Sequence, residues 1–542
     1  MVASRFARST LCENVKGPLD STPSPLGENM TGDAAPFRTP RLIRTFLIIG
    51  LFASPLIAGP DKPSAESSIE ADEWYSVRLQ DAKCGYMHSA LERVGDEVHT
   101  TTRMVLEIAR DAARVKISMN QSYRESLDGK PLAFNYTMTM GNIPVTYEGK
   151  IKDGKVTLLS EQSGAKRESV YDFDPEARFA WGQLLEQRKR GLKPGTQFTV
   201  KTYEPSMKVD GALEMTIKVH GKESVDVLGK KQTLHRITST LNMGTPIDTE
   251  SWVDDDATPI VSVVNMGIMQ VKMYRTTREE ALEGGQAPEM FVNTFVKVAR
   301  KVPTAARSAT FRLRMAQDGK VRLPDIPNTS MQTFKRMTAY EGELTVRRID
   351  WAALRKIKTV SSIGDDLQQF TIASTTLNID DRRIKRLARQ ATKSAKTPAD
   401  KADALRKFVT DYVTDKSLDV GFATASEVAR NRCGDCTEHG VLLAALARAA
   451  GMPARGVSGL VQVPSGPLGA DDIKAFGFHM WAQVNIDGRW VDIDAAMRQT
   501  DCDPTHIALA LMPLNDEGMM DSLMSILPLL GRLEIDVVDI QK

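Results

Sequence analysis

The alternation of apolar and polar residues predicts that the first half of the chain is built mainly from β-strands. Apolar side chains recur at every second position in stretches such as FNYTMTM and ALEMTIKVHG, which is the period of a strand with one covered face. The pair Asp153-Gly154 is a two-residue hairpin signal within this pattern. We therefore expect a mostly antiparallel β-rich domain at 73–285.

One segment of that domain has the features of a helix. In DPEARFAWGQLLEQRKRG, Asp174 is a candidate N-cap, Pro175 stands at the first helical position and Gly191 follows the last turn. We expect a single helical insert there. Further strand-like segments, ATFRLRMA and GELTVRRI, lie within 290–375. This second β-rich region is expected to be either a small domain or an elaboration of the first.

From residue 376 the apolar period becomes helical. The segment DDRRIKRLARQAT places Ile384 and Leu387 on one face, and TPADKADALRKFVTDYV begins after Thr397 as a cap, with Pro398 at its first position. Strand-like segments follow these helices. The chain as a whole therefore predicts an α+β fold, with a domain of helices and strands at 376–515 and a C-terminal segment at 516–542.

The N-terminus has the pattern of an export signal. Arg38, Arg41 and Arg44 have no acidic neighbour and precede the apolar run FLIIGLFASPLIAG. The run is shorter than the ~20 residues that a membrane-spanning helix needs, which favours a cleaved signal over a permanent anchor. Cleavage is expected near Ala58, and Met30 is the expected start of translation.

This pattern assigns 1–59 to an N-terminal extension with a signal-like segment and 60–72 to a polar linker rich in Pro and Ser. We expect an exported protein, periplasmic or secreted, that is membrane-anchored if the segment is not cleaved. Association with the cell envelope would then run through this segment.

Composition narrows the range of partners. The 542 residues are 42% hydrophobic, and 71 basic side chains nearly cancel 69 acidic ones. No basic stripe interleaved with aromatic residues is evident, so nucleic acid is not an expected partner. Five cysteines in a chain of this length do not make a disulfide framework.

Candidate chemistry starts at NRCGDCTEHGVLLAALARAAG. The residues after Cys436 are apolar almost all round, which predicts a buried helix, with Asp435 as N-cap and Glu438 completing a capping box. Cys436 then lies in the first turn, where the helix dipole and free backbone N–H groups favour a thiolate and could receive an oxyanion. The alternative is that Cys436 is a small buried hydrophobic residue.

A histidine that could act as base lies in FGFHMWAQVNIDGRWVDIDAAM, where period-two alternation and Asp487-Gly488 predict a hairpin. A two-residue turn places Trp481 opposite Asp494 and His479 opposite Ala496. His479 and Asp494 are then diagonal neighbours on one face, roughly 7 to 8 Å apart between backbones.

The carboxylate has a rival in this hairpin. Asp492 shares the face of Asp494 but lies one pair further from His479, so it is the weaker candidate. A carboxylate that accepts from one imidazole nitrogen leaves the other free to take a thiol proton, which is the arrangement that activates cysteine in acyl transfer. A three-residue turn would instead send Asp494 to the opposite face.

These segments resemble the transglutaminase-like superfamily, whose core carries a G-[DE]-C helix start, an alanine-rich helix and turn, an HaW strand and a W-x-x-x-D strand. The corresponding segments are GDCTEHGVLLAALARAAGMPAR, HMW and WVDID, in the family's order. The resemblance covers roughly 376–515 and implies a papain-like fold. It also implies Cys436 as nucleophile, His479 as general base and acid, and Asp494 as the residue that orients the histidine.

The chain departs from the family's pattern at two positions. Ala495 stands where the family often has proline, which should not affect the carboxylate. Cys433 adds a second thiol, and its oxidation to a bridge with Cys436 would switch an enzyme off. His439 on the helix is expected to serve packing or capping, and His506, in the family-like segment CDPTHIAL, is expected to be structural.

The resemblance implies an exported thiol-dependent acyl-transfer enzyme that acts on amide or peptide bonds of a protein or peptide substrate, without a cofactor or metal. Hydrolysis by a protease or amidase is favoured over cross-linking by a transglutaminase. One alternative is a non-catalytic envelope scaffold that keeps the fold for binding. A dithiol oxidoreductase using Cys433 and Cys436 is another, and a zinc site is disfavoured because no second cysteine pair appears.

Overall fold

The computed structural model describes residues 67–79, 81–110, 113–140, 143–242, 246–266, 269–288, 294–316, 322–358, 363–415, 423–463, 474–516 and 526–542. The expected export signal at 1–59, with Met30 and the cleavage position, lies outside these residues. The described chain has an α+β fold in which strands predominate, as the sequence predicts.

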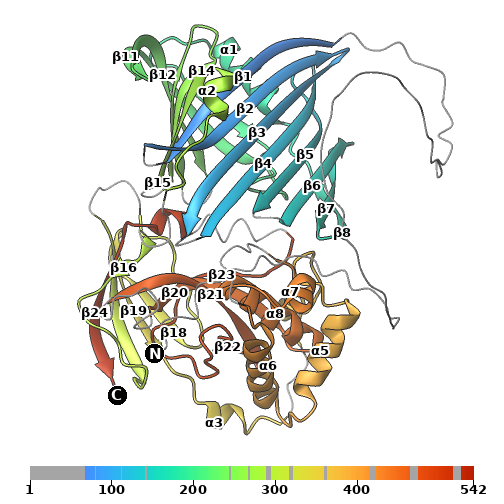
Figure 1. Ribbon diagram of the computed structural model, residues 1–542, viewed down its shortest axis with the longest axis vertical. Helices are drawn as coiled ribbons and strands as arrows, with labels where there is room; N and C mark the ends of the chain where they lie inside the picture. The colour runs from blue at the N-terminus through green and yellow to red at the C-terminus, as the bar shows by residue number, and fades with distance from the viewer. Residues whose placement is uncertain are drawn as a thin grey trace, which may run out of the picture. The chain divides into compact units, whose positions relative to one another are not determined.

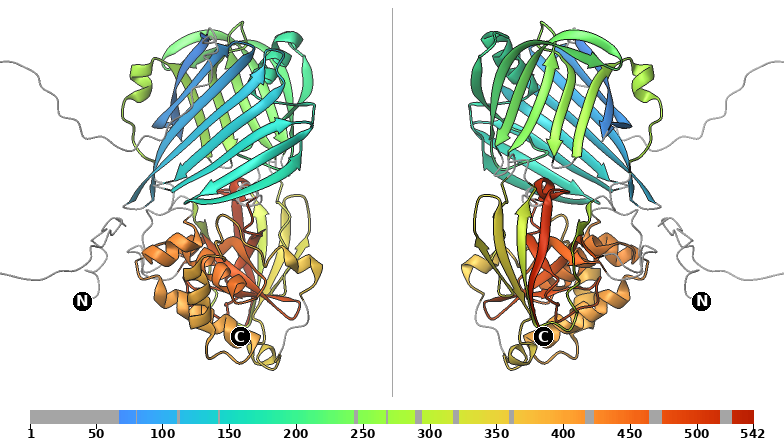
Figure 2. Two further views of the ribbon diagram at one scale, coloured as in Figure 1. Left: turned by 90° about the vertical axis from the view of Figure 1, so that its right-hand side faces the viewer. Right: turned by 90° about the vertical axis from the view of Figure 1, so that its left-hand side faces the viewer.

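The N-terminal half forms one sheet of fifteen strands, in the order β8-β7-β6-β5-β4-β3-β2-β1-β15-β14-β13-β12-β11-β10-β9. Most neighbours in the sheet are also neighbours in the chain, so the sheet is a succession of hairpins. Figures 1 and 2 show that it curves until its two halves face each other. Its strands are β1 (Ser67–Leu79), β2 (Ala82–Val94), β3 (Glu97–Arg110), β4 (Ala113–Ser126), β5 (Pro131–Met140), β6 (Ile143–Lys152), β7 (Lys155–Gln162), β8 (Ala165–Asp172), β9 (Ala177–Arg178), β10 (Gln197–Thr202), β11 (Leu213–Val227), β12 (Lys230–Asn242), β13 (Ile247–Val253), β14 (Pro259–Met266) and β15 (Met269–Thr276).

Two details of this sheet bear on the sequence analysis. The hairpin predicted at Asp153-Gly154 joins β6 to β7, and both residues have the positive φ that a two-residue turn requires. Strand β1 starts at Ser67, so the end of the stretch expected as linker at 60–72 is already paired with β2. The start of β1 is polar, so its sequence does not predict a strand. It forms one because it pairs with β2 and β15.

The helical insert is present but starts later than the sequence predicts. Helix α1 spans Ala180–Arg190 and ends at Gly191, as expected, whereas its N-cap is Phe179. Asp174 and Pro175 precede β9 instead. The α1 N-terminus is satisfied from a distance, because the carboxylate of Glu125 on β4 accepts the N–H groups of Trp181 and Gly182 at 2.8 and 2.9 Å. A cap supplied by another strand leaves no local sequence signal.

The C-terminal half is organised in three layers around a five-stranded sheet. That sheet has the order β16-β21-β20-β23, with β22 paired to β21. The helices α5 to α8 gather beside it (Figure 1), and their apolar faces form one continuous core with it. The elements are β16 (Val296–Lys297), β20 (Ala454–Gln462), β21 (Ala475–Ile486), β22 (Arg489–Ile493), β23 (Ile507–Met512), α5 (Arg382–Thr392), α6 (Pro398–Tyr412), α7 (Ala425–Asn431) and α8 (Cys436–Ala449).

The second β-rich region is an extension of this C-terminal half. Strands β17 (Ser308–Met315), β18 (Gln332–Arg336) and β19 (Glu341–Arg347) form a four-stranded sheet with β24 (Leu533–Gln541). Its inner side chains share one apolar core with the five-stranded sheet, and Phe311 meets Phe476 edge to face with ring centroids 5.7 Å apart. The segments 290–375 and 516–542 therefore help to cover the far side of the sheet that carries the candidate site.

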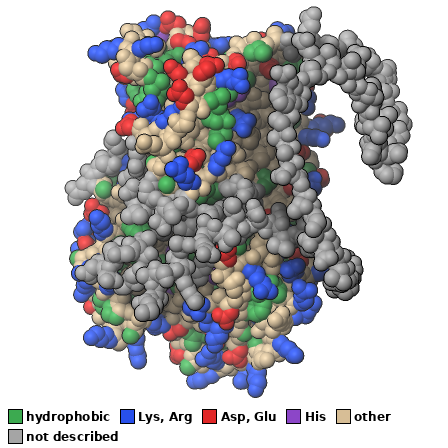
Figure 3. Space-filling view, viewed as in Figure 1, with side chains coloured by type: hydrophobic (Ala, Val, Ile, Leu, Met, Phe, Trp, Pro, Cys, Tyr) green, Lys and Arg blue, Asp and Glu red, His purple; other side chains and the backbone are tan. Residues whose placement is uncertain are grey.

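Shorter elements complete the described chain: α2 (Arg278–Leu282), α3 (Trp351–Leu354), α4 (Asp365–Gln368) and a 3₁₀ turn at Leu527–Leu529. Over the described ranges from 67 to 542, none of the helices combines the length and the apolar composition needed to cross a membrane. On the face drawn in Figure 3, Lys and Arg side chains are intermixed with Asp and Glu side chains.

Candidate active site

The start of helix α8 sets the position of Cys436. Asp435 is the N-cap, and its carboxylate accepts the backbone N–H of Thr437 at 2.8 Å and that of Glu438. The Glu438 side chain in turn accepts a hydrogen bond from the Asp435 N–H at 3.0 Å, which completes the predicted capping box. Cys436 is therefore the first residue of a helix whose start is specified by its own sequence.

The residue before the cap has to be glycine. Gly434 has φ of 149°, a backbone conformation that other residues rarely adopt. A Cβ atom at this position would lie 2.2 Å from the Cβ of Glu438. The sequence analysis did not explain this glycine, because the requirement comes from the buried side chain that folds back over it.

Glu438 is fully buried at this helix start. Its second carboxylate oxygen accepts the N–H of Ala423 at 3.2 Å. Burial, and then the neighbouring Asp435 carboxylate, raise the pKa of Glu438 to about 8. A carboxyl that is largely neutral near pH 7 adds little negative charge beside the Cys436 thiol.

The capping box leaves one backbone N–H group in the first turn of α8 without an acceptor in the described chain. Two N–H groups are taken by Asp435, whereas the N–H of Cys436 has no acceptor among the described residues. A backbone N–H at a helix start can stabilise negative charge on an oxygen. The sequence analysis expected several such donors, and the capping box reduces them to one.

The histidine is placed by the predicted hairpin. Ile486 pairs with Arg489 and Gln483 with Asp492, so the turn at Asp487-Gly488 has two residues, as predicted. Apolar side chains of strand β21 belong to the core shared with α8 and, towards the start of the strand, to the core shared with the four-stranded sheet. This central position buries most of its side chains.

The register continues only as far as Ile493, which pairs with Ala482. The predicted pairs of Trp481 with Asp494 and of His479 with Ala496 are not formed, so this part of the prediction is wrong. Asp494 exchanges two backbone hydrogen bonds of 2.8 Å with Gln499 instead, because the chain turns back on itself directly after β22. The carboxylate nevertheless reaches His479.

The three residues singled out from the sequence meet in the structure. His479 Nε2 lies 2.7 Å from Asp494 Oδ2, and the Cys436 thiol is close enough to the same imidazole to raise its pKa. Since Nε2 faces the carboxylate, Nδ1 is the nitrogen left for the thiol proton. Burial opposes a charge on His479, but Asp494 and the thiol outweigh it and raise the pKa of His479 to about 10.

The rival carboxylate is engaged elsewhere. Asp492 Oδ1 accepts the indole N–H of Trp481 at 2.9 Å and the amide of Gln483 at 2.6 Å. The Trp481 ring in turn lies almost parallel to the His479 ring, with centroids 6.1 Å apart. Asp492 therefore holds a ring that packs beside the histidine, whereas Asp494 contacts the histidine itself.

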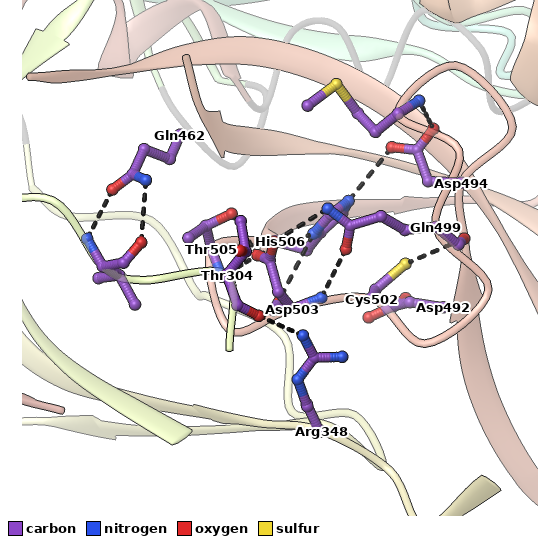
Figure 4. A network of polar contacts seen from close by, with 12 residues as sticks. Thr304, Arg348, Gln462, Asp492, Asp494, Gln499, Cys502, Asp503, Thr505 and His506 are labelled. Atoms are coloured by element: carbon purple, nitrogen blue, oxygen red, sulfur yellow. Dashed lines mark hydrogen bonds and ion pairs between the residues drawn. The ribbon is translucent and has the colours of Figure 1, made fainter. Parts of the chain in front are cut away.

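Asp494 has further partners that the hairpin does not reveal (Figure 4). Its Oδ1 accepts the N–H of Met497 at 2.8 Å, and His506 Nε2 lies 3.2 Å from Oδ2. Burial disfavours the carboxylate, yet the two histidines hold the pKa of Asp494 far below its usual range. The only sequence signal for His506 was its place in CDPTHIAL, and its contact with Asp494 was not predicted.

The other sulfur atoms near the site are in different states. Cys436 has a free thiol, so the bridge between Cys433 and Cys436 is not formed. Cys502 is fully buried, and burial raises the pKa of its thiol to about 12.

His439 is buried on α8 with Nδ1 2.6 Å from the carbonyl oxygen of Asp435, which agrees with the packing or capping role expected for it.

Comparison with known families identifies one domain. Residues 385–495 match the family model described as the transglutaminase-like superfamily. The chain therefore has a transglutaminase-like domain on its C-terminal side, preceded by a large β-rich region. None of the curated proteins matches the chain.

Solved structures give partial matches to this chain, all with low TM-scores. A candidate cysteine protease from Cytophaga hutchinsonii is 15% identical over 43% of this chain and 86% of its own, with a TM-score of 0.28. A beta-barrel-like protein of a domain of unknown function from Brucella abortus is 15% identical over 38% of this chain and 95% of its own, with a TM-score of 0.32. The periplasmic domain of TgpA from Pseudomonas aeruginosa is 14% identical over 36% and 92%, with a TM-score of 0.21.

Proposed function

We propose that this protein is an exported cysteine-dependent enzyme that transfers acyl groups from amide or peptide bonds through a thioester on Cys436. The observation that carries the proposal is the position of one partly buried imidazole between the other two candidate groups in their influence on it. His479 lies 2.7 Å from the carboxylate of Asp494, and the thiol of Cys436 is close enough to raise the pKa of the same ring. The transglutaminase-like domain at 385–495 supports the same class of enzyme.

The proposed reaction starts with transfer of the Cys436 proton to Nδ1 of His479. The thiolate attacks the carbonyl carbon of the substrate amide, and the oxygen takes up negative charge near the N–H of Cys436. The carbon–nitrogen bond then breaks. His479 gives its proton to the departing amine, and Asp494 stabilises the imidazolium between the two transfers.

The thioester is resolved by a second nucleophile. Water or an amine attacks the carbonyl carbon, His479 accepts its proton, and the carbon–sulfur bond breaks to restore the thiolate. Water gives hydrolysis and a lysine amine gives a cross-link, with the same three residues in both cases. We propose a protease or amidase acting on a protein or peptide, as the sequence analysis favours. Export is part of this proposal and rests on Arg38, Arg41, Arg44 and the apolar run that follows them.

The test compares the chemical reactivity of cysteines within one purified full-length chain. Iodoacetamide is applied near pH 7, and the alkylation rate of each cysteine is followed by peptide mass spectrometry. Cys436 should react about 30-fold faster than a thiol with the ordinary pKa of about 8.5, because almost all of an activated cysteine is thiolate at this pH. The same chain unfolded in urea, where Cys436 is an ordinary exposed thiol, serves as the reference.

Two variants make the experiment decisive. His479→Gln should reduce the Cys436 rate to that of an ordinary thiol, whereas Cys433→Ser should leave it within about twofold. Addition of a fluorescent primary amine and a protein acceptor then separates the outcomes, since incorporation of the amine indicates transfer and its absence with cleavage indicates hydrolysis. An unactivated Cys436 in the wild type would favour the scaffold, and loss of activity in Cys433→Ser would favour the dithiol oxidoreductase.

A further inference from the structure

His506 occupies a position that the proposed mechanism does not use. Its ring is buried between β21 and the chain after β22, and the Trp481 ring meets it edge on at a centroid distance of 5.2 Å. Nε2 lies 3.2 Å from Asp494 Oδ2. Nδ1 lies 3.3 Å from the carbonyl oxygen of Asp503 and 3.7 Å from its carboxylate Oδ1 (Figure 4).

The oxygens around this ring restrict its protonation state. A carbonyl oxygen and an ionised carboxylate can only accept hydrogen bonds, so both ring nitrogens have to donate. Neutral imidazole has a single N–H and would leave a lone pair pointing at an oxygen. Only the imidazolium, with two N–H groups, satisfies both sides of His506 in this buried place.

The charges around His506 agree with a cation. Asp494 and Asp503 face its two nitrogens, Asp492 lies close enough to interact, and the Cys502 thiol is also in contact. The imidazole of His479 contacts the same carboxylate oxygen of Asp494. Burial lowers the pKa of His506, but Cys502, Asp494 and Asp503 outweigh it and raise the pKa well above its ordinary value.

Asp503 is itself fixed by the turn that carries it. Its Oδ1 accepts both the N–H and the hydroxyl of Thr505, at 2.9 and 2.5 Å, and its Oδ2 accepts the Gln499 side-chain amide at 2.9 Å. The backbone of Gln499 is the partner of Asp494. The two carboxylates on either side of His506 are therefore held by one short stretch of chain.

We propose that His506 is a positioning residue that remains protonated throughout the reaction and shares the Asp494 carboxylate with His479. The inference rests on the proposed function, because it assigns His506 a role through His479. A permanent cation on Oδ2 partly neutralises Asp494, so His479 holds its proton less tightly and releases it more readily to the departing amine. The His506 cation also keeps Oδ2 of Asp494 directed at the His479 ring.

The first experiment observes the charge directly in the wild-type protein. The full chain is labelled with 15N only at histidine, and the ring nitrogens are followed by NMR from pH 6 to pH 9, with the His506 signals assigned by their loss in His506→Gln. We expect two protonated nitrogens at His506 over the whole range. A neutral tautomer at pH 7 overturns the proposal, and if His506→Gln does not fold, the His506 signals are assigned by their shift in Asp503→Asn.

The second experiment measures the effect on His479. Glutamine at 506 can donate one N–H to Asp494 but carries no charge. In His506→Gln, the alkaline limb of the pH profile of Cys436 alkylation should move upward by about one pH unit. This shift corresponds to a tenfold change in the acid dissociation constant of the His479 imidazolium. Asp503→Asn should shift it in the same direction by less. His235→Gln, which removes another histidine paired with an aspartate, should leave the profile unchanged.

The outcomes separate the two proposals. If His506 is merely structural, His506→Gln lowers the melting temperature and leaves the alkaline limb in place, and the inference fails while the proposed function stands. If Cys436 in the wild type reacts as an ordinary thiol, the proposed function fails, and the NMR titration still reports the charge of His506. Should His506→Gln fail to fold, Asp503→Asn and the wild-type spectrum decide.

Discussion

Two contacts between histidine and aspartate, one in each half of the molecule, have almost the same length. His235 Nε2 lies 2.9 Å from Asp255 on the long sheet, and His479 Nε2 lies 2.7 Å from Asp494 in the C-terminal half. The aspartate side chains differ, being 77% exposed in the first pair and 1% exposed in the second. Water screens the first pair, whereas the second interacts in a medium of low polarity.

The architecture of the two halves explains this difference. The long sheet is a run of hairpins, so its charged side chains alternate outward to solvent and form short ion pairs there. In the C-terminal half, most side chains of β21 are buried, and its apolar side chains belong to the cores shared with α8 and with a second sheet. Identical chemical groups therefore make a surface contact in one half and a candidate reaction centre in the other. Paired substitutions, one in each half, test this view.

The largest contrast is expected for buried and exposed arginines. Arg448 donates to the carbonyl oxygens of Ala454 at 3.0 Å and Ile372 at 2.8 Å, and also to that of Pro513. Arg448→Met should destabilise the protein by about 3 kcal/mol, because it leaves buried acceptors without partners. Arg114→Met, which removes an exposed pair with Glu107, should cost less than about 0.5 kcal/mol. Urea unfolding of the full chain measures both, and equal losses would contradict the comparison.

The next contrast concerns the two aspartates. Asp494→Asn removes the charge that stabilises the His479 imidazolium, so the alkylation rate of Cys436 at pH 7 should fall about 30-fold, a change of about 2 kcal/mol. Asp255→Asn serves as the matched control and should change the rate by less than about twofold. A similar rate in Asp494→Asn and wild type would show that the buried carboxylate does not support the thiolate.

The smallest contrast concerns two glycines with positive φ. Gly434→Ala should destabilise the protein by about 1 kcal/mol more than Gly154→Ala, because a Cβ at 434 meets Glu438 at 2.2 Å while a Cβ at 154 meets nothing within 4 Å. Both variants place alanine at a positive φ, which is 149° at Gly434 and 71° at Gly154. Melting temperatures reveal the difference, and the alkylation rate of Cys436 shows whether the helix start has moved. Equal losses would mean that Glu438 rearranges freely.

The candidate site was partly readable from local sequence. The capping box of Asp435 and Glu438, the two-residue turn at Asp487-Gly488 and the apolar surface of α8 are all confirmed, because each depends on residues that are close in the chain. The position of Asp494 opposite Trp481 was wrong. Strand pairing stops one residue earlier, and no local sequence pattern near Asp494 predicts that the chain turns back to pair with Gln499.

Distant contacts explain the remaining differences. Helix α1 begins at Ala180 because Glu125 caps it from another strand, and 290–375 joins the C-terminal half because β17 pairs with β24. Such pairings depend on which surfaces meet when the whole chain is folded. Periodicity reveals that a strand has an apolar face but not which other face will cover it.

The order of residues along the chain determined the kinds of elements and the identity of three candidate reactive groups, because helix caps, tight turns and strand periods are encoded within a few positions. The folded molecule decided which of those groups lose contact with water, and it brought His506 onto the same carboxylate as His479. Burial changes the free energy of a charge far more than any neighbour in sequence does, and burial is a property of the assembled layers.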